Sequence, residues 1–269
     1  MRYDPIKKGV GRFFSGPVFM RKLFFLLLDL LLLRTWHVKK ALRKIALEYP
    51  GGAMVLDAGA GFGQYSWRMS RINKNWRIKA VDIDQIHIND NNLFFTKAGI
   101  SDRVTCEIMD LALLNETDAY DFILSVDVME HIKEDEMVFR NFCRALRSGG
   151  TLLISIPSDK GGSDVRNEHD KSFIGEHVRD GYSISDISLK LERAGFRNIV
   201  AAYTYGKPGN VSWRLSMKYP VRMVGISQLF YLILPFYYLI FFPVAIILNF
   251  FDLCSDHKTG TGLLVSAKK

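Results

Sequence analysis

Short apolar runs alternate with helical segments along residues 50–206, and this alternation constrains the fold more than any other feature of the chain. Segments 137–146 and 184–194 have the apolar spacing of helices, whereas the short runs are predicted strands. Strands separated by helices form a parallel sheet that is covered on both faces. The sequence therefore predicts a doubly wound α/β fold, with strands over residues 54–57, 77–82, 104–109, 122–126, 151–156, 198–203 and 262–267.

The excess positive charge of the chain is confined to its first fifth. The sequence has 36 Lys plus Arg and 28 Asp plus Glu, a net charge of +8. Residues 1–50 contain eleven of the basic and three of the acidic residues, so the rest of the chain is neutral. This distribution argues against a catalytic domain built to bind nucleic acid. It indicates a basic segment that faces an anionic partner such as a membrane surface.

The N-terminal segment, residues 1–49, is predicted to be helical and to lie outside the sheet domain. Its apolar run, residues 23–33, is too short to span a bilayer, is interrupted by Asp29 and lacks a cleavage site for a signal peptide. Two interpretations stay open, a helix in the membrane interface and a helix packed on the main domain.

Cys106, Cys143 and Cys254 form no disulfide framework, which indicates a reducing, cytoplasmic compartment.

An insertion over residues 207–257 separates the last two predicted strands. Residues 223–251 are 29 consecutive uncharged residues, nine of them aromatic. If the flanking strands share a sheet, both ends of the insertion lie on one side of a membrane, and two crossings would need about 40 helical residues. Pro235 and Pro243 are expected to break any continuous helix. The sequence thus predicts a monotopic attachment by broken helices in one leaflet, with a soluble helical cap or dimer interface as the alternative.

Three basic residues lead into this uncharged run. Arg214, Lys218 and Arg222 are spaced four apart, so they are expected to share one helical face. That face would lie toward anionic lipid, on the cytoplasmic face of the membrane.

A glycine-rich loop follows the first predicted strand. Asp57 ends that strand, and Gly59, Gly61 and Gly63 follow, allowing a tight turn and a close approach of a ligand to the backbone. The loop does not match the NAD-binding fingerprint, because Gln64 stands where that fingerprint needs its third glycine. It does not match a phosphate-binding loop either, because the Gly-Lys-Ser/Thr sequence that ends such loops is absent. An acid at a strand end followed by Gly-x-Gly-x-Gly resembles motif I of the class I S-adenosylmethionine-dependent methyltransferases.

The resemblance continues at the following strand ends, over roughly residues 36–206 and 260–269. It implies S-adenosylmethionine as cofactor and a Rossmann-like sheet of seven strands with the last one antiparallel. Asp82 matches the acid that holds the ribose hydroxyls, and Asp110 matches the acid that accepts from the adenine amino group. The implied cofactor-binding residues are Asp57, Gly59, Gly61, Gly63, Asp82, Ile83, Asp110, Leu111 and Asp127. The methyltransferase domain would comprise residues 50–206 and 258–269.

Three histidines are the candidate catalytic residues. His131 follows the fourth strand, where acceptors usually bind in this family, and its unperturbed pKa suits a general base. His169 and His177 belong to a polar segment after the fifth strand that resembles acceptor-covering loops of the family. Asp127, Glu130 and His131 also resemble a divalent-ion site of quinone O-methyltransferases, but ligands so close in sequence are insufficient, and no metal is predicted.

These features together predict methyl transfer to a hydrophobic or lipid-linked acceptor at a membrane face. The motif typical of DNA amino-methyltransferases, Asn/Asp-Pro-Pro-aromatic, is absent after the fourth strand, and no nucleic-acid partner is expected. Two alternatives stay open. One is a membrane-anchored binding or assembly protein without turnover, and the other is a soluble small-molecule methyltransferase with a helical cap. The acceptor atom and the oligomeric state are left undetermined.

Overall fold

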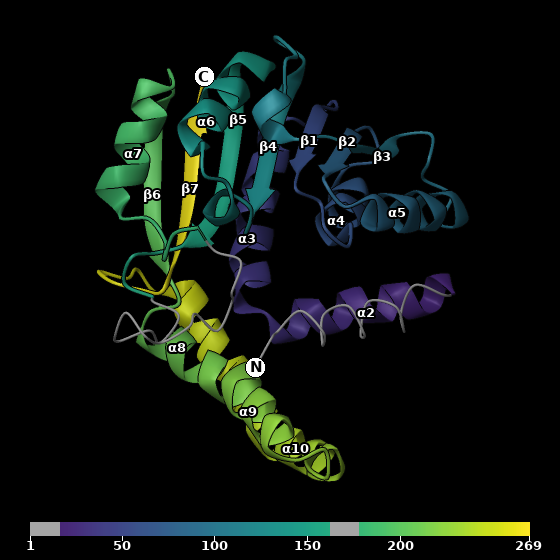
Figure 1. The fold of residues 1–269 in the computed structure, drawn as a ribbon, viewed down its shortest axis with the longest axis vertical. Helices are drawn as coiled ribbons and strands as arrows, with labels where there is room; N and C mark the ends of the chain where they lie inside the picture. The colour runs from purple at the N-terminus through teal and green to yellow at the C-terminus, as the bar shows by residue number, and fades with distance from the viewer. Residues whose placement is uncertain (1–16, 162–177) are drawn as a thin grey trace.

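The sheet contains seven strands in the order β3-β2-β1-β4-β5-β7-β6 (Figure 1). This computed structural model describes residues 17–161 and 178–269. Strand β7 runs antiparallel to its neighbours β5 and β6, and the other strands are parallel to one another. The predicted fold is therefore confirmed. The strands are β1 (Met54–Ala58), β2 (Arg77–Asp82), β3 (Val104–Ile108), β4 (Tyr120–Val126), β5 (Leu146–Pro157), β6 (Arg197–Thr204) and β7 (Gly262–Lys268).

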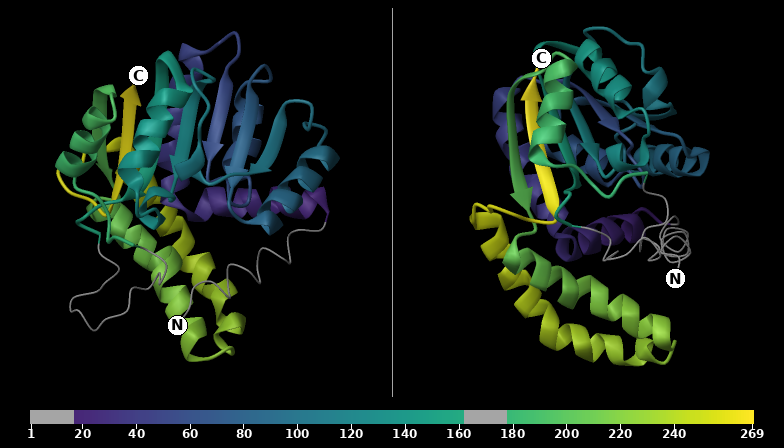
Figure 2. Two further views of the ribbon diagram at one scale, coloured as in Figure 1. Left: turned by 45° about the horizontal axis from the view of Figure 1, so that its top comes forward. Right: turned by 60° about the vertical axis from the view of Figure 1, so that its left-hand side comes forward.

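Two hydrophobic cores form, one on each face of the sheet (Figure 2). Successive strand residues point to opposite faces, so Leu56 belongs to one core and its neighbour Val55 to the other. The first core lies beneath α6 (Asp135–Ala145) and α7 (Ile184–Arg193). The second lies beneath α2 (Val18–Leu31), α3 (Leu33–Glu48), α4 (Gln64–Ile72) and α5 (Gln85–Lys97). Burial on both faces explains the apolar runs of the central strands β4 and β5, whereas the edge strands β3 and β6 are partly exposed.

Strand β5 begins earlier than the sequence indicates. Gly149 and Gly150 suggested a turn before the strand, but β5 continues through them from Leu146. The pairing with β4 shifts register between Tyr120 and Phe122, and Gly149 has a φ of 75°. A bulge with a glycine in the left-handed region accommodates the extra residue without ending the strand.

Helix α2 packs on the main domain, which is one of the two positions that the sequence left open. Its charged residues Arg21 and Asp29 face the protein and are buried. Phe24 and Phe25 of the same helix are also buried, and they belong to the second core. Phe19, Leu26 and Leu27 point the other way and are exposed. Helix α2 is therefore packed on the domain while it presents an apolar outer face.

A helical hairpin leaves the sheet at the carboxyl ends of its parallel strands (Figures 1 and 2). Its first limb consists of α8 (Lys207–Trp213), the π-helix η3 (Arg214–Lys218) and α9 (Tyr219–Ile226). Its second limb is α10 (Phe230–Cys254), which is continuous through Pro235 and Pro243. The expectation of helices broken at these prolines is wrong. The first limb is also about as long as a membrane-spanning helix, so length alone does not exclude two crossings.

Contacts between the two limbs hold the hairpin together near these prolines. The hydroxyl of Tyr237 donates to the carbonyl of Leu215 at 2.8 Å, and that of Tyr238 donates to the carbonyl of Ser216 at 2.9 Å. Both acceptors lie in the widened turn η3. A proline inside a helix removes one backbone hydrogen bond, but packing against a neighbouring helix can compensate for that loss.

A buried carboxylate joins the base of the hairpin to the sheet. Asp252 has no exposed surface and accepts from the backbone N–H groups of Tyr205 (3.2 Å) and Gly209 (3.0 Å). It also contacts Nε2 of His37 at 2.8 Å and Nε2 of His257 at 3.1 Å. Burial by itself raises the pKa of Asp252, but these hydrogen bonds and charges outweigh it, and the pKa lies below its ordinary value. Asp252 thus connects α3, α8 and α10 at one point.

We predict that Asp252→Asn lowers the free energy of unfolding at pH 7 by about 3 kcal/mol, because a buried carboxylate that accepts hydrogen bonds from two backbone N–H groups and contacts two histidines is lost. The folded-state pKa is below the unfolded value of about 3.9, so the stabilisation is present above that pH and disappears as the pH falls through the folded pKa. Chemical denaturation of both proteins at pH 7 and at acid pH measures this, and the difference should shrink at acid pH. The exposed Asp256→Asn is the control, and equal stability of Asp252→Asn and wild type at pH 7 would contradict the prediction.

Candidate functional site

Three glycines with left-handed backbone shape the loop between β1 and α4. Gly59, Gly61 and Gly63 have φ values of 83°, 51° and 75°. A Cβ at Gly59 would lie 2.3 Å from Cγ2 of Val128, and one at Gly63 would lie 2.7 Å from Oδ1 of Asn91, so neighbouring side chains require glycine there. A Cβ at Gly61 would meet no atom within 4 Å. Gly61 therefore leaves open space beside the backbone, where a ligand can approach.

The acid at the end of β2 lies directly against this loop. Oδ2 of Asp82 accepts from the backbone N–H of Gly61 at 2.7 Å, and Oδ1 accepts from that of Asp84 at 2.9 Å. Each carboxylate oxygen keeps a second acceptor position, so Asp82 can also bind ligand hydroxyls. Ile83, the next residue, is 75% exposed and offers an apolar surface beside the carboxylate.

The acid after β3 also caps a short helix. Oδ1 of Asp110 accepts from the backbone N–H of Ala112 at 2.9 Å and begins the turn η1 (Leu111–Leu113). Leu111 is buried in the core beneath that turn. The structure thus places Asp82 and Asp110 at the carboxyl ends of adjacent strands, the edge at which open α/β sheets bind ligands.

Asp57 differs from the other predicted cofactor residues because it is buried, with 2% of its surface exposed. Its Oδ2 accepts from Oγ of Ser66 at 2.5 Å. Burial raises the pKa of Asp57 to about 6, although the bond from Ser66 opposes the shift. This contact fastens the end of β1 to helix α4. Asp57 therefore stabilises the two ends of the glycine loop, β1 and α4, through this contact.

The turn after β4 lies next to the loop and contains a charged pair. Asp127 has a φ of 52° and forms an ion pair with Arg34 of α3. Val128 packs against Gly59, which places this turn against the glycine loop. His131 ends the short helix η2 (Met129–His131) and is exposed. The structure thus brings Asp127 to the cofactor loop and places His131 farther along the same segment.

The remaining predicted catalytic residues, His169 and His177, lie outside the described residues. Within residues 17–161 and 178–269, no group of three or more His, Cys, Asp or Glu side chains has a geometry that could hold a metal ion. The segment that contains Glu130 and His131 therefore offers no metal site among the described residues.

Helix α2 contacts the glycine loop in a way that the sequence did not reveal. Nη2 of Arg21 donates to the carbonyl of Phe62 at 2.8 Å and to Oδ1 of Asn91 at 2.7 Å. Nδ2 of Asn91 donates to the carbonyl of Gly61 at 2.8 Å. The backbone of the loop is thereby held from α2 and from α5. These contacts join segments up to 70 residues apart, so no local pattern predicts them.

Arg34 is another residue that sequence reasoning missed. Its backbone N–H donates to the hydroxyl of Tyr205 at 2.8 Å, and its side chain pairs with Asp127. Its role was only weakly indicated in the sequence, because Arg34 is a single charged residue at the end of the apolar run 23–33. Arg34 brings the first turn of α3 to the edge of the sheet where Asp127 lies.

Comparisons with known proteins agree with this geometry. A family described as a methyltransferase domain matches residues 34–201. A phosphoethanolamine N-methyltransferase of Triticum aestivum is 29% identical over 157 residues, which cover 58% of this chain and 30% of that protein. A ubiquinone biosynthesis O-methyltransferase of Xanthomonas axonopodis pv. citri is 28% identical over 122 residues, which cover 43% of this chain and 50% of that enzyme. The matched regions thus span half or less of these relatives.

Solved structures share the fold. Phosphoethanolamine N-methyltransferase 2 of Haemonchus contortus, in complex with S-adenosyl-L-methionine, superimposes with a TM-score of 0.58 at 19% identity, covering 84% of this chain and 52% of that one. A putative sarcosine dimethylglycine methyltransferase of Galdieria sulphuraria has a TM-score of 0.57 at 18% identity, covering 87% and 85%. The family match covers more than half of the chain, and the glycine loop and strand-end acids agree with it. The chain therefore belongs to the methyltransferase-domain family, and its fold is that of the class I S-adenosylmethionine-dependent methyltransferases.

Proposed function

We propose that this methyltransferase acts at one face of a membrane, on a hydrophobic or lipid-linked acceptor. The observation that carries the proposal is the exposure of α10. This helix has 25 residues, of which only Ala245, Asn249 and Asp252 are buried. It is the one helix among the described residues that is long and apolar enough to cross a membrane. A core helix of a soluble domain would be largely buried, and exposed apolar surface of this extent favours contact with lipid.

The position of the hairpin supports the same proposal. Both the hairpin and α2 lie beyond the carboxyl ends of the parallel strands (Figures 1 and 2). The glycine loop and the strand-end acids are at this edge as well. A membrane that received the hairpin would therefore face the side of the sheet where the cofactor and the acceptor bind. An acceptor held in that membrane could reach the site without leaving it entirely.

Charge distribution favours attachment to one leaflet over two crossings. Thr204 of β6 pairs with Gly262 of β7, so both ends of the hairpin lie on the same side. The first limb carries Lys207, Arg214, Lys218 and Arg222 along its length. Placing such a cation at the centre of a bilayer costs about 2.5–3.5 kcal/mol. We therefore propose a monotopic attachment at the cytoplasmic face, with residues 207–257 as the membrane segment of a protein whose catalytic domain is 50–206 with 258–269.

The chain's own residues suit an in-line methyl transfer. S-adenosylmethionine supplies an activated methyl group on a sulfonium, so the protein mainly orients the reactants. The carboxylate of Asp82 can accept from the ribose hydroxyls, while the open backbone at Gly61 admits the cofactor. His131 is proposed to take the proton that the acceptor loses when its oxygen or nitrogen attacks the methyl carbon. His169 and His177 are the alternative bases.

We predict that Gly61→Val abolishes S-adenosylmethionine binding, because the side chain fills the space that the cofactor needs. Gly99→Val is a matched control, since Gly99 also has a left-handed φ, of 71°, and also has open space around its Cβ position. Both variants should lose similar stability, about 1–2 kcal/mol from backbone strain. Calorimetric titration should show binding only in Gly99→Val and wild type. Wild-type affinity in Gly61→Val would remove the loop from the cofactor site.

We predict that His131→Ala lowers turnover about 10²- to 10⁴-fold, with cofactor affinity nearly unchanged, if His131 is the general base. Rescue of the variant by added imidazole would support a role in proton transfer. Turnover is measured by release of S-adenosylhomocysteine with a lipid extract as acceptor source. A variant with ordinary turnover would leave positioning alone as the mechanism, or move the base to His169 or His177.

We predict that a thiol at Leu239, in the middle of α10, becomes protected from a water-soluble maleimide when vesicles are added. Leu239 is 76% exposed in the free protein, so Leu239→Cys should label readily without lipid. The native Cys254 is exposed at the base of the hairpin and should stay reactive with lipid. Leu239→Cys is made in a Cys254→Ser background so that each position is read separately.

The same variant tests the topology. Labelling of Leu239→Cys by maleimide enclosed inside the vesicles would show that the hairpin crosses the bilayer. A protein that stays monodisperse without detergent and binds no vesicle would contradict the membrane proposal and favour the soluble enzyme with a helical cap. Vesicle binding and cofactor binding without any methyl transfer would favour the non-catalytic assembly protein.

A further inference from the structure

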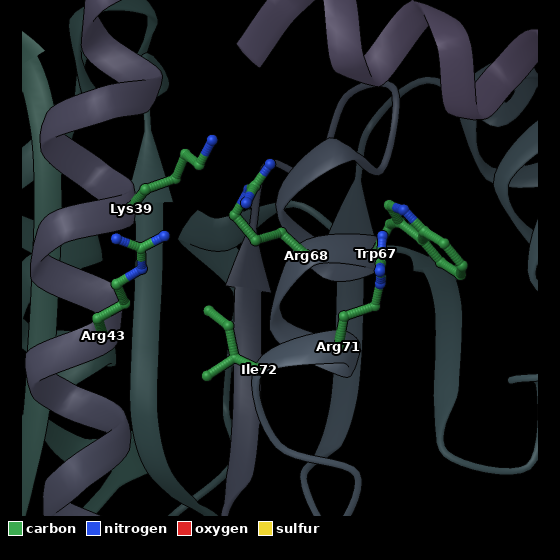
Figure 3. A pocket seen from close by; sticks show the side chains of 6 residues that line it. All are labelled: Lys39, Arg43, Trp67, Arg68, Arg71 and Ile72. Atoms are coloured by element: carbon green, nitrogen blue, oxygen red, sulfur yellow. The ribbon is translucent and has the colours of Figure 1, made fainter.

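A basic pocket lies between α3 and α4, outside the proposed catalytic site (Figure 3). Its volume is about 290 Å³. Four cationic side chains line it together with two apolar ones. They are Lys39, Arg43, Trp67, Arg68, Arg71 and Ile72. The cations come from two neighbouring helices; Lys39, Arg43 and Arg68 point into the space between them, while Arg71 lies against Trp67 (Figure 3).

The charge of this basic pocket is only partly neutralised. Asp29 is the carboxylate paired there, with Arg68 and, at 3.6 Å, with Lys39. Arg43 and Arg71 form no ion pair with the residues that the structure describes. Burial, followed by repulsion from Arg71, lowers the pKa of Arg68 to about 10. Four cations against one carboxylate leave an excess that an anion would offset.

The side chains indicate which anion the pocket suits. Guanidinium groups bind phosphate oxygens in a bidentate manner, and three of the four cations are arginines. The Nζ atom of Lys22, from α2, lies 5.1 Å from the ring centroid of Trp67, so the basic pocket adjoins α2. The outer face of α2 is apolar at Phe19, Leu26 and Leu27. A phosphate group bound in the pocket would thus have an apolar surface beside it.

We propose that the basic pocket binds the phosphate of an anionic phospholipid headgroup, whose acyl chains lie along the outer face of α2. This inference rests on the proposed membrane-face function and adds a specific lipid site to it. Basic pockets near a membrane surface bind such headgroups more selectively than scattered surface charges do. The exposed cations of the hairpin, such as Arg214 and Arg222, supply a general attraction to anionic membranes, whereas the pocket supplies recognition of one phosphate.

The test compares vesicles of phosphatidylcholine with vesicles that also contain phosphatidylglycerol, in a co-sedimentation titration. The variant is Arg43→Gln with Arg71→Gln, because neither arginine forms an ion pair in the described structure. Each cation near an anionic surface contributes a factor of about five, so affinity for phosphatidylglycerol vesicles should fall about 25-fold. Affinity for pure phosphatidylcholine vesicles should not change. The control is Arg140→Gln with Arg193→Gln, two exposed arginines on α6 and α7.

The possible results separate the pocket from the membrane proposal and from a free anion. Equal losses in the pocket variant and the control, or no loss in either, would overturn the pocket while leaving membrane attachment intact. Thermal stabilisation of the wild type, but not of the pocket variant, by inorganic phosphate without any dependence on lipid headgroup would overturn the lipid source in favour of a soluble phosphate ester. Failure of the wild type to bind either vesicle would overturn the membrane function and the lipid site together.

Discussion

The pairing of β7 between β5 and β6 is the constraint on which the rest of this structure depends. Seven residue pairs join β5 to β7, from Thr151–Lys268 to Pro157–Gly262, and β6 flanks β7 on its other side. Strand β7, which follows the hairpin in sequence, therefore lies between β5 and β6 in the sheet. Because β6 and β7 are adjacent and antiparallel, the two ends of the hairpin must lie together at one edge. Asp252 reinforces that junction with backbone and histidine contacts.

Most of the candidate functional residues lie at one edge of the sheet, at the carboxyl ends of its parallel strands. Parallel strands end there, and the left-handed glycines turn the chain back while leaving the backbone at Gly61 accessible. The acids that follow β2 and β3 lie at the same edge, and the hairpin and α2 lie beyond it (Figure 1). This edge therefore has strand-end carboxylates on one side and helices with exposed apolar residues on the other.

Helix α2 buries two charged side chains, Arg21 and Asp29, beside the apolar Phe24 and Phe25. Arg21 is buried, and burial lowers its pKa, although Asp90 opposes the shift. The cost of burying the guanidinium is offset by its hydrogen bonds to the loop carbonyl of Phe62 and to Asn91. Other apolar side chains of α2, those of Phe19, Leu26 and Leu27, are exposed. The same helix therefore supports the cofactor loop and borders the basic pocket.

Local patterns located the strands and the glycine loop, apart from the early start of β5, because strands and glycine turns are specified by residues close in sequence. The β2 strand was predicted with its observed bounds, and Asp82, Gly61 and Asp110 lie where the spacing placed them. The continuity of α10 through two prolines could not be predicted, since it depends on hydroxyl contacts from Tyr237 and Tyr238 to another helix. The Arg34–Asp127 pair and the basic pocket likewise join residues distant in sequence. Sequence periodicity indicates which face of a helix or strand is apolar. The residues that this face, or a charged side chain on it, contacts are determined only by the packing of the tertiary structure.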